Sequence, residues 1–290
     1  MDLHEILKNY NTEQKCVDYL KLIRWNSKVE CTYCSSTRVY ERNGSCRFKC
    51  RDCNRSFSVT VGTIFHNSKI PLTKWFLAIS IVIAAKKGVS SRQLARTINV
   101  NKDTAWYMQY RIRLAMKEDI LLQGLIEVDE TYIGGALGNM SPEKKKKRNP
   151  FRSGMVHKMP VLGMMERKKG KVRLFCIDHA NGKTIQPIMK EVINSKSKIV
   201  TDGFGGYYGI SKHFNRHIRI NAEKKQRAWG RYHVNTLEGF FSIIKRAIIG
   251  QYHHLSSEHL QSYMDEIAFK KNHRNENGFN LLLAKACAVM

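Results

Sequence analysis

The sequence predicts a multidomain protein with a small zinc-binding module, a helix-turn-helix and a mixed α/β domain. Paired cysteines predict the first part, because a bound metal can stabilise a module with few apolar residues. Two short amphipathic helices joined by a turn predict the second part, and strand patterns followed by helical ones predict the third. We expect an N-terminal helical segment, the zinc module, the helix-turn-helix segment and a C-terminal domain at residues 1–25, 26–62, 63–120 and 121–290.

The basic excess of the chain points to a polyanionic partner. Fifty Lys and Arg residues stand against 24 Asp and Glu, which leaves a formal net charge of +26. Such an excess is typical of proteins that bind nucleic acid or an anionic membrane surface. The longest apolar run, Trp75–Ala85, is far shorter than the roughly 20 residues that cross a bilayer. The N-terminus lacks the pattern of a secretory signal. We therefore expect nucleic acid as the partner, no membrane contact and a reducing cytoplasm.

The zinc module rests on the spacing of four cysteines. Cys31-x-x-Cys34 and Cys50-x-x-Cys53 have the arrangement of two knuckles that close a tetrahedral Cys₄ site. The alternative is a set of buried or redox-active cysteines, but clustered pairs favour metal. Four thiolates leave no open coordination position, so we expect this Zn²⁺ to be structural.

The helix-turn-helix covers residues 88–116. Ser90 or Ser91 can cap a first helix, and a second helix follows the turn at 99–101, with Ala105, Met108 and Ile112 directed inward. In a helix-turn-helix the second helix enters the major groove. An ordinary helical hairpin in a core is the alternative. The surface that would face DNA then carries Lys102, Asp103, Thr104, Tyr107 and Arg111.

Three acids occur where solubility does not require them. Asp129 lies within or at the end of the strand pattern 125–135, Asp202 ends another strand before a glycine-rich turn, and Glu238 lies on a helix. Carboxylates gathered from two strands and a helix suggest a pair of Mg²⁺ ions, which prefer hard oxygen ligands. The alternative is ordinary surface, since Glu127 shares a strand face with Asp129 and Glu130 is its neighbour.

The helix at 235–249 carries its polar residues in one line. Asn235, Glu238, Ser242 and Lys245 fall on a single stripe at a period of 3.6, while apolar residues cover the rest. A solvent-facing stripe would explain this pattern, and so would a helix that directs Glu238 into an active site. Lys245, two turns beyond Glu238, could then reach a phosphate.

The chain resembles the DDE transposases of bacterial insertion sequences that carry an N-terminal zinc ribbon. The resemblance extends along nearly its whole length. It rests on the paired cysteines, the helix-turn-helix and the stretches RSFSVTVGTIFHNSKIPLTKWFLAI, EVDETYIGG, TDGFGGY, HVNTLEGFFSIIKR and YHHLSSEHLQSYMDEIAFKKNHR.

The resemblance implies a ribonuclease H-like catalytic domain with acids on its first and fourth strands and on a later helix. Asp129 and Asp202 match the two aspartates. Some relatives have Asn and others Glu at the third position, and this helix offers both Asn235 and Glu238. Lys245 follows Glu238 as the lysine does in such families, so we choose Glu238 as the third ligand and Asn235 as its assistant.

The implied activity is that of a transposase acting on its own mobile element in the bacterial nucleoid. It would bind the terminal inverted repeats in double-stranded DNA, cleave 3′ ends with two Mg²⁺ (or Mn²⁺) ions and join them to a target strand. Pairing two ends requires a homodimer or a larger assembly. Two alternatives remain: a DNA-binding regulator with a vestigial catalytic domain, and a structure-specific metal-dependent nuclease.

Overall fold

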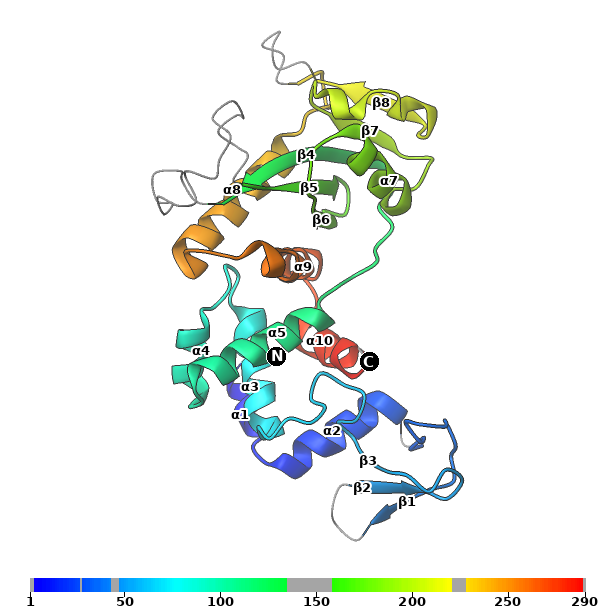
Figure 1. Cartoon of the computed structure of the whole chain (residues 1–290), viewed down its shortest axis with the longest axis vertical. Helices are drawn as coiled ribbons and strands as arrows, with labels where there is room; N and C mark the ends of the chain where they lie inside the picture. Colours follow the sequence, from blue (N-terminus) through cyan, green and yellow to red (C-terminus); the bar gives the residue numbers. More distant parts are fainter. Residues whose placement is uncertain (1–2, 27, 43–46, 135–157, 221–227, 289–290) are drawn as a thin grey trace. The chain divides into compact units, whose positions relative to one another are not determined.

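The computed structural model describes residues 3–26, 28–42, 47–134, 158–220 and 228–288 (Figure 1). The chain forms two compact units, of which one comprises Met1–Lys117 with His273–Met290 and the other comprises Glu118–Asn272. The sequence predicted a C-terminal domain at 121–290. The division differs from that prediction at its end, because the last segment belongs to the unit that holds the N-terminus.

The first unit is mainly helical, and its helices begin where the sequence supplies caps. The side chains of Thr12, Ser90 and Asn101 accept N–H groups of the first helical turns. Asn26 and Asn99 end two helices in the left-handed conformation. The helices are α1 (Leu3–Asn9), α2 (Glu13–Trp25), α3 (Leu72–Ala84), α4 (Ser91–Ile98), α5 (Lys102–Ala115) and α10 (Gly278–Cys287).

A three-stranded antiparallel sheet follows α2 in the same unit. Its strands, in the order β1-β2-β3, are β1 (Val39–Arg42), β2 (Arg47–Cys50) and β3 (Ser56–Ser58). The rings of Phe48 and Phe57 lie 5.5 Å apart and pack against Trp25 at the end of α2. With Cys31 and Cys50 these aromatic residues form a very small core.

The C-terminal helix α10 packs in this unit and was not predicted from the sequence. The N–H of Ile64 donates to the carbonyl of Ala286 at 3.1 Å. The Tyr19 hydroxyl donates to Asn280 Oδ1 at 3.0 Å, and Phe279 packs edge-on to Phe76 of α3. Residues from the two ends of the chain therefore share one core.

The second unit is built on a five-stranded mixed sheet of order β6-β5-β4-β7-β8. β4, β5 and β6 pair antiparallel, whereas β7 runs parallel to β4 and β8 parallel to β7. The strands are β4 (Leu125–Ile133), β5 (Met159–Glu166), β6 (Val172–Cys176), β7 (Lys198–Thr201) and β8 (Arg216–Arg219). The helices are α7 (Gly182–Val192), α8 (Asn235–Ala247) and α9 (Ser257–Asn272). Short turns at Gly205–Tyr207 and Ile210–Lys212 and a π-helical segment at Ile248–Tyr252 complete the unit.

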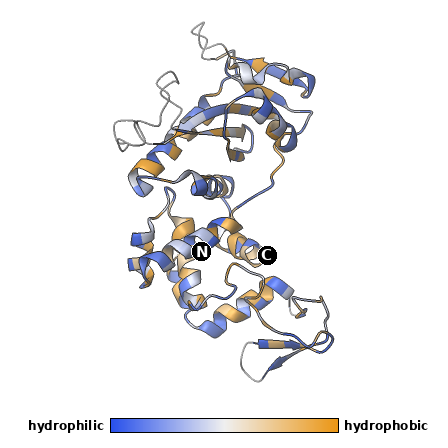
Figure 2. Cartoon of the chain, viewed as in Figure 1, coloured by the Kyte–Doolittle hydropathy of each residue, from blue (hydrophilic) through white to orange (hydrophobic). Residues whose placement is uncertain are grey.

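The two faces of this sheet carry separate cores. On one face, Ile126 and Val128 of β4 pack with α7. On the other face, Ile133 and residues of β5 and β6 pack with α8 and α9. Figure 2 shows the alternation of hydrophobic and hydrophilic residues along α8 that this arrangement requires.

Candidate active site and metal centre

The four paired cysteines meet at one point of the first unit. Their sulfur atoms lie within 4.8 Å of one another, with Cys31 Sγ 3.6 Å from Cys53 Sγ. Cys34 Sγ lies 3.6 Å from Cys50 Sγ. Thiolates bound tetrahedrally to Zn²⁺ at about 2.3 Å are separated by about 3.8 Å, so the arrangement fits a structural zinc site.

Asp129 and Asp202 come from neighbouring parallel strands and lie at the same level of the sheet. The ladder between β4 and β7 pairs Glu127 with Val200, and continuing it by two residues sets Asp129 opposite Asp202. Neighbouring strands are about 4.8 Å apart. Side chains alternate between the faces, so both aspartates share the face of Glu127, which contacts α8. Asp202 Oδ1 also accepts the N–H of Phe204 at 3.0 Å.

Helix α8 presents the polar stripe to solvent and its apolar residues to the sheet. The exposed residues of the stripe are Asn235, Glu238, Ser242 and Lys245. The buried ones are Leu237, Phe240, Phe241, Ile244 and, just after the helix, Ile248. The stripe therefore has the exposure that either sequence interpretation requires.

The helix lies close to the sheet because β5 has a glycine beside Asp129. Gly163 pairs with Asp129 across the β4–β5 ladder. A Cβ atom on Gly163 would lie 2.7 Å from Phe241 Cζ and 3.1 Å from Leu237 Cδ1. A side chain at position 163 would therefore have to displace the Phe241 ring or the helix that carries it.

A buried ion pair fixes the first turn of α8. Glu127 is fully buried, and its Oε1 accepts hydrogen bonds from Arg167 Nε at 2.9 Å and Nη2 at 2.6 Å. Its Oε2 accepts the N–H of Leu237 at 3.0 Å, which satisfies a donor at the start of the helix. Arg167 also donates to the carbonyls of His233, at 2.7 Å, and Arg231. We call Glu127 and Arg167 the anchor pair of α8.

Burial and like charges act on the Asp129 carboxyl. Burial raises its pKa from 3.8 to about 7, and the negative charges of Asp202, Glu130 and Glu238 act in the same direction. The backbone N–H of Glu130, 2.8 Å from Asp129 Oδ1, opposes this shift. Asp129 thus lies within electrostatic reach of both other predicted acids, in a site that favours a cation.

Glu130 is a further carboxylate at this edge of the sheet. Its Oε2 accepts a hydrogen bond from the buried Tyr207 hydroxyl at 2.6 Å. Burial raises the pKa of Glu130 to about 7, and the charge of Asp202 adds to this effect. Its Oε1 is buried without a hydrogen-bond partner among the described residues. Glu130 therefore ties the turn after β7 to β4.

The carboxylates offer a donor set that fits Mg²⁺, although they are not drawn together as the cysteines are. A divalent cation would bind these hard oxygen ligands and offset the repulsion between their charges. It would also give the unpaired buried oxygen of Glu130 a partner. Within the described part of the chain, only the four cysteines form a group of three or more such ligands within 4.8 Å.

The residues predicted to face DNA lie on α5 with different degrees of exposure. Lys102, Asp103 and Tyr107 are exposed, whereas Thr104 is half-buried. Arg111 is half-buried, and its Nη1 donates to the carbonyl of His66 at 2.8 Å. Three residues predicted to point inward, Ala105, Met108 and Ile112, are fully buried. The exposed Trp106, stacked on Tyr110, is a surface feature that the sequence analysis did not single out.

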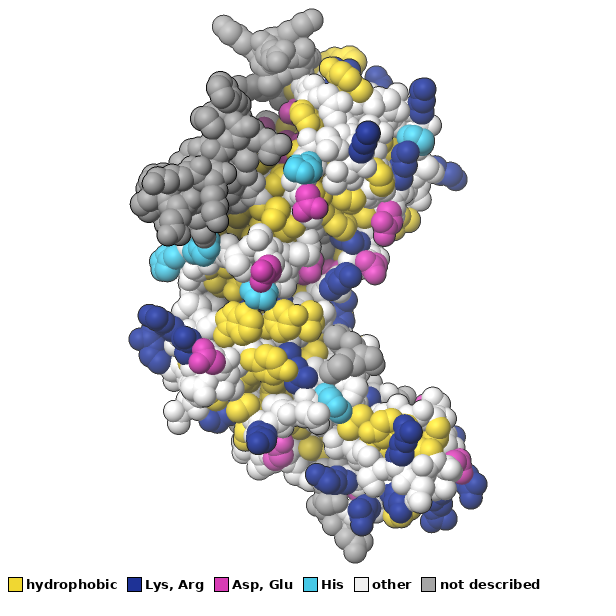
Figure 3. All heavy atoms as spheres, in the orientation of Figure 1, with side chains coloured by type: hydrophobic (Ala, Val, Ile, Leu, Met, Phe, Trp, Pro, Cys, Tyr) yellow, Lys and Arg dark blue, Asp and Glu magenta, His cyan; other side chains and the backbone are white. Residues whose placement is uncertain are grey.

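Basic side chains are not confined to α5. In the view of Figure 3, Lys and Arg side chains are visible on both units, and several lie around the zinc-binding sheet. A run of four lysines and an arginine within residues 141–150 lies outside the described residues. The described part of the chain holds no helix long and apolar enough to cross a membrane.

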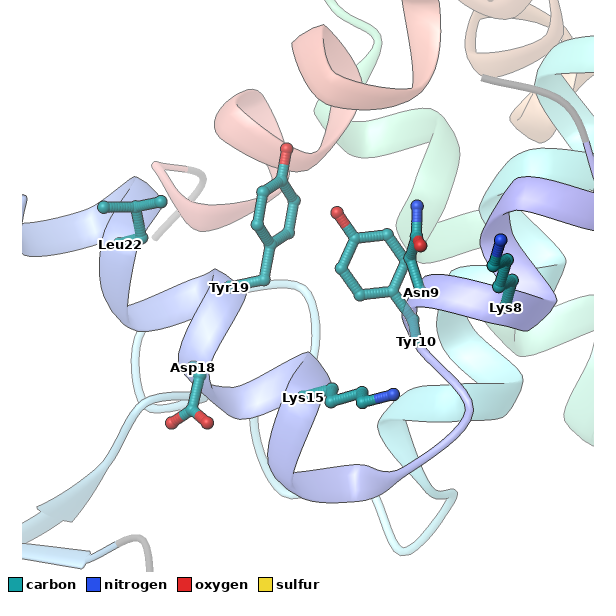
Figure 4. A pocket seen from close by; sticks show the side chains of 7 residues that line it. All are labelled: Lys8, Asn9, Tyr10, Lys15, Asp18, Tyr19 and Leu22. Atoms are coloured by element: carbon teal, nitrogen blue, oxygen red, sulfur yellow. The ribbon is translucent and has the colours of Figure 1, made fainter.

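A hollow of about 640 Å³ in the first unit has no comparable chemistry. The rings of Tyr10 and Tyr19 face each other in it at 5.0 Å, and the Tyr19 hydroxyl is already bound to Asn280. Figure 4 shows the residues that line this hollow, which are Lys8, Asn9, Tyr10, Lys15, Asp18, Tyr19 and Leu22.

Two family models match this chain, one in each unit. The profile of the ISXO2-like transposase domain matches residues 121–272, and that of the transposase zinc-ribbon domain matches residues 11–56. The chain belongs to the ISXO2-like transposase family. It is also 28% identical, over 252 residues, to an uncharacterised protein in transposable element ISH50 of Halobacterium salinarum. That alignment covers 83% of this chain and 84% of the relative.

The transposase domain coincides with the second unit almost to the residue, and it excludes α10. It contains all three predicted acids and the anchor pair. The sequence analysis treated Glu127 as possible surface and did not consider Arg167. One feature of the sequence could have indicated Glu127, because it shares a strand face with Asp129. Its ion-pair partner, Arg167, lies 40 residues further along the chain.

Proposed function

We propose that this transposase binds the terminal inverted repeats of its element, cleaves DNA at the element's 3′ ends and joins them to a target. The observation that carries the proposal is the β4–β7 ladder, whose register, continued by two residues beyond Glu127 and Val200, sets Asp129 opposite Asp202. The acids converge on one edge of a sheet, in a chain with a net charge of +26. DNA is the substrate that such a surface attracts.

The topology supports a ribonuclease H-like catalytic domain. Three antiparallel strands are extended by two parallel ones on the side of β4, in the order β6-β5-β4-β7-β8. The aspartates belong to the first and fourth strands in chain order, and the third acid to a later helix. This is the distribution that the sequence resemblance implied.

Glu238 is our choice for the third ligand. Its charge acts on Asp129, which supports a position close to the two aspartates. A carboxylate also offsets the charge of a bound cation, whereas an amide does not. Asn235, one turn earlier on the same exposed stripe, would assist by contacting the metal shell or DNA. Lys245 would contact a phosphate further along.

The chain's own residues prepare the site in three ways. Asp129, Asp202 and Glu238 would hold two Mg²⁺ ions, which when bound stabilise charge on the attacking and leaving oxygens of phosphoryl transfer. The anchor pair and Gly163 hold α8 over the carboxylates. Glu130 holds the turn that follows Asp202 through Tyr207. Water first cleaves a phosphodiester and frees a 3′-hydroxyl, which then displaces the 3′-oxygen of a target phosphodiester.

The first unit would select the DNA. The capped helices α4 and α5, joined by a tight turn at Asn99, support a helix-turn-helix with Lys102, Thr104, Tyr107 and Arg111 on or near its recognition surface. Gln109 fixes α5 to the start of α4, because it donates to the Val89 carbonyl and accepts from Ser91. Two ends must be held together, so we expect a homodimer or larger assembly on DNA.

The test uses donor DNA that carries the inverted repeats flanking the gene, with Mg²⁺ or Mn²⁺. We would compare the wild type with Asp129→Asn, Asp202→Asn, Glu238→Gln and Asn235→Ala for 3′-end cleavage and strand joining. Glu258→Gln, which removes an exposed acid from the first turn of α9, is the matched control. We expect at least a hundredfold loss in the three acid variants, partial activity in Asn235→Ala and full activity in the control.

Other outcomes favour the alternatives. A wild type that binds the ends without cutting them points to a regulator, and cleavage that ignores the end sequence points to a structure-specific nuclease. If Glu238→Gln cuts normally while Asn235→Ala does not, Asn235 is the third ligand.

A further inference from the structure

Three basic residues of the second unit surround one tyrosine on the sheet face that carries the aspartates. Lys198 and Arg216 begin β7 and β8 and pair with each other in the ladder. The guanidinium of Arg231 lies 5.4 Å from the centre of the Tyr232 ring, and its Nη2 is 3.5 Å from the hydroxyl. Trp229 completes the group, with Arg216 6.0 Å from its ring. We call Lys198, Arg216 and Arg231 the basic cluster.

The cluster is built on a fixed base. Trp229 and Tyr232 exchange backbone hydrogen bonds of 2.8 and 3.0 Å across a tight turn. Tyr232 packs on the apolar residues Val200, Ile218 and Val234. Arg167 of the anchor pair donates to the Arg231 carbonyl. The sheet therefore positions Lys198 and Arg216, and the anchor pair of α8 holds the backbone of Arg231.

The charges of the cluster are available to an anion. Hydrogen bonding and charge from Arg231, followed by the charges of Lys198 and Arg216, lower the pKa of Tyr232. Within the described part of the chain, no ion pair to an acid is found for any of the three. Arg216 and Arg231 are exposed, and Trp229 is 54% exposed.

Protection of an edge strand is the simplest other reason for such charges, because β8 ends the sheet. That role explains Arg216, but Lys198 lies on β7, an interior strand, and Arg231 lies on a turn. Convergence of charges from three segments around a polar hydroxyl, beside an exposed indole, suits a phosphate backbone better.

The place of the cluster relates it to the proposed reaction. Lys198 and Asp202 lie on the same face of β7 and are four residues apart, which is about 13 Å along a strand. We propose that the basic cluster binds the phosphate backbone of the DNA end, a few nucleotides from the bond that is cut. This inference rests on the proposed function, since it assigns the DNA contact to the strand that enters the same site.

The test measures how DNA binding depends on salt. Full-length protein is titrated, without divalent metal, onto a fluorescent duplex carrying the inverted repeat, over a series of KCl concentrations. The variant replaces Lys198, Arg216 and Arg231 by Ala. The control replaces Lys183, Lys190 and Lys196, which are exposed on and after α7 at the other face of the sheet. Both variants lose three positive charges, and thermal melting checks that both are folded.

Each lost phosphate contact lowers the slope of log K against log salt by about 0.9. We expect the cluster variant to lose about two to three units of slope and to bind at least tenfold more weakly at moderate salt. The control should keep the wild-type slope.

Equal slopes in the wild type and both variants overturn the inference. So does a loss of self-association in the cluster variant with unchanged DNA binding, which would assign the patch to a second copy of the chain. These outcomes are independent of cleavage. A wild type that cuts DNA while the slopes stay equal keeps the proposed function and removes the cluster. If the slope depends on the basic cluster but the protein never cuts DNA, the inference stands and the proposed function is wrong.

Discussion

The zinc-binding sheet and the carboxylate edge both gather candidate metal ligands, but they do so to different degrees. The cysteine sulfurs lie within 4.8 Å of one another over a core of a few aromatic rings. The carboxylates lie on a large, separately stabilised sheet, and no three of the described acids come that close. In the first region the metal supplies the stability that the core lacks. In the second, apolar cores on both faces support the sheet.

The largest expected effect is the removal of zinc. Structural Zn²⁺ sites of this kind contribute on the order of 10 kcal/mol to folding. Cys50→Ser, or treatment with a strong chelator, should therefore unfold the sheet β1–β3, and limited proteolysis should cut within residues 28–60. The transposase domain should melt as before.

Cys176→Ser is the matched control, because Cys176 lies on β6 away from the cluster. A zinc-free protein that resists proteolysis at 28–60 would show that the aromatic core suffices, and the contrast between the two regions would disappear.

A smaller effect is expected from the anchor pair. Glu127→Ala leaves Arg167 without its buried partner, and breaking a buried ion pair costs about 3–5 kcal/mol. Urea unfolding of the full chain should show this loss in the transition of the transposase domain. Glu191→Ala removes an exposed acid from α7 and should change stability by less than about 0.5 kcal/mol.

Rescue distinguishes positioning from packing alone. Replacing Glu127 by Gln and Arg167 by Met removes both charges, which should recover much of the stability. If α8 needs the pair for its position, cleavage should stay impaired in this stable double variant. Normal cleavage there would reduce the anchor pair to a stabilising contact.

The smallest expected effect is on the pH dependence of the metal-free protein. Because the pKa of Asp129 is raised from 3.8 to about 7, the folded state keeps a proton that the unfolded chain loses. The stability that Asp129 contributes is therefore fully present below pH 4 and is lost as pH rises toward 7. This change lowers the free energy of unfolding by at most about 4 kcal/mol.

Asp129→Asn should flatten this decline, whereas Asp178→Asn, at an exposed position, should not. Thermal melting at several pH values without divalent metal measures both. Mg²⁺ should then stabilise the wild type at pH 8 and leave Asp129→Asn unchanged. A wild type with no decline between pH 4 and 7 would mean that neither burial nor the neighbouring charges raise the pKa of Asp129.

The parts of the site that the sequence predicts are those set by local pattern. Cysteine spacing predicted the zinc site, and alternation along strand and helix predicted the faces of β4 and α8. The parts it did not predict depend on contacts between distant segments. Glu127 looks like surface until Arg167 and the Leu237 N–H are brought to it. The role of Gly163 also depends on a distant residue, because only the fold brings Phe241 against it.

The fold follows the same rule. The strands that lead to Asp129 and Asp202 were predicted from local pattern, whereas β8, Arg216–Arg219, is only four residues long and was not. Helix α10 is strongly apolar, but nothing in its sequence tells which unit it joins. Its partners, Ile64 and Tyr19, lie more than 200 residues earlier in the chain.

The return of α10 to the first unit has a consequence for biosynthesis. A ribosome makes residues 3–117 first, then the whole transposase domain, and only then the helix that finishes the first core. The transposase domain can thus fold from one continuous stretch of chain before α10 is available to pack in the first unit. A chain terminated after residue 272 would contain every proposed metal ligand but would lack α10 of the first unit. Such truncation should therefore impair DNA recognition more than it impairs the fold of the transposase domain.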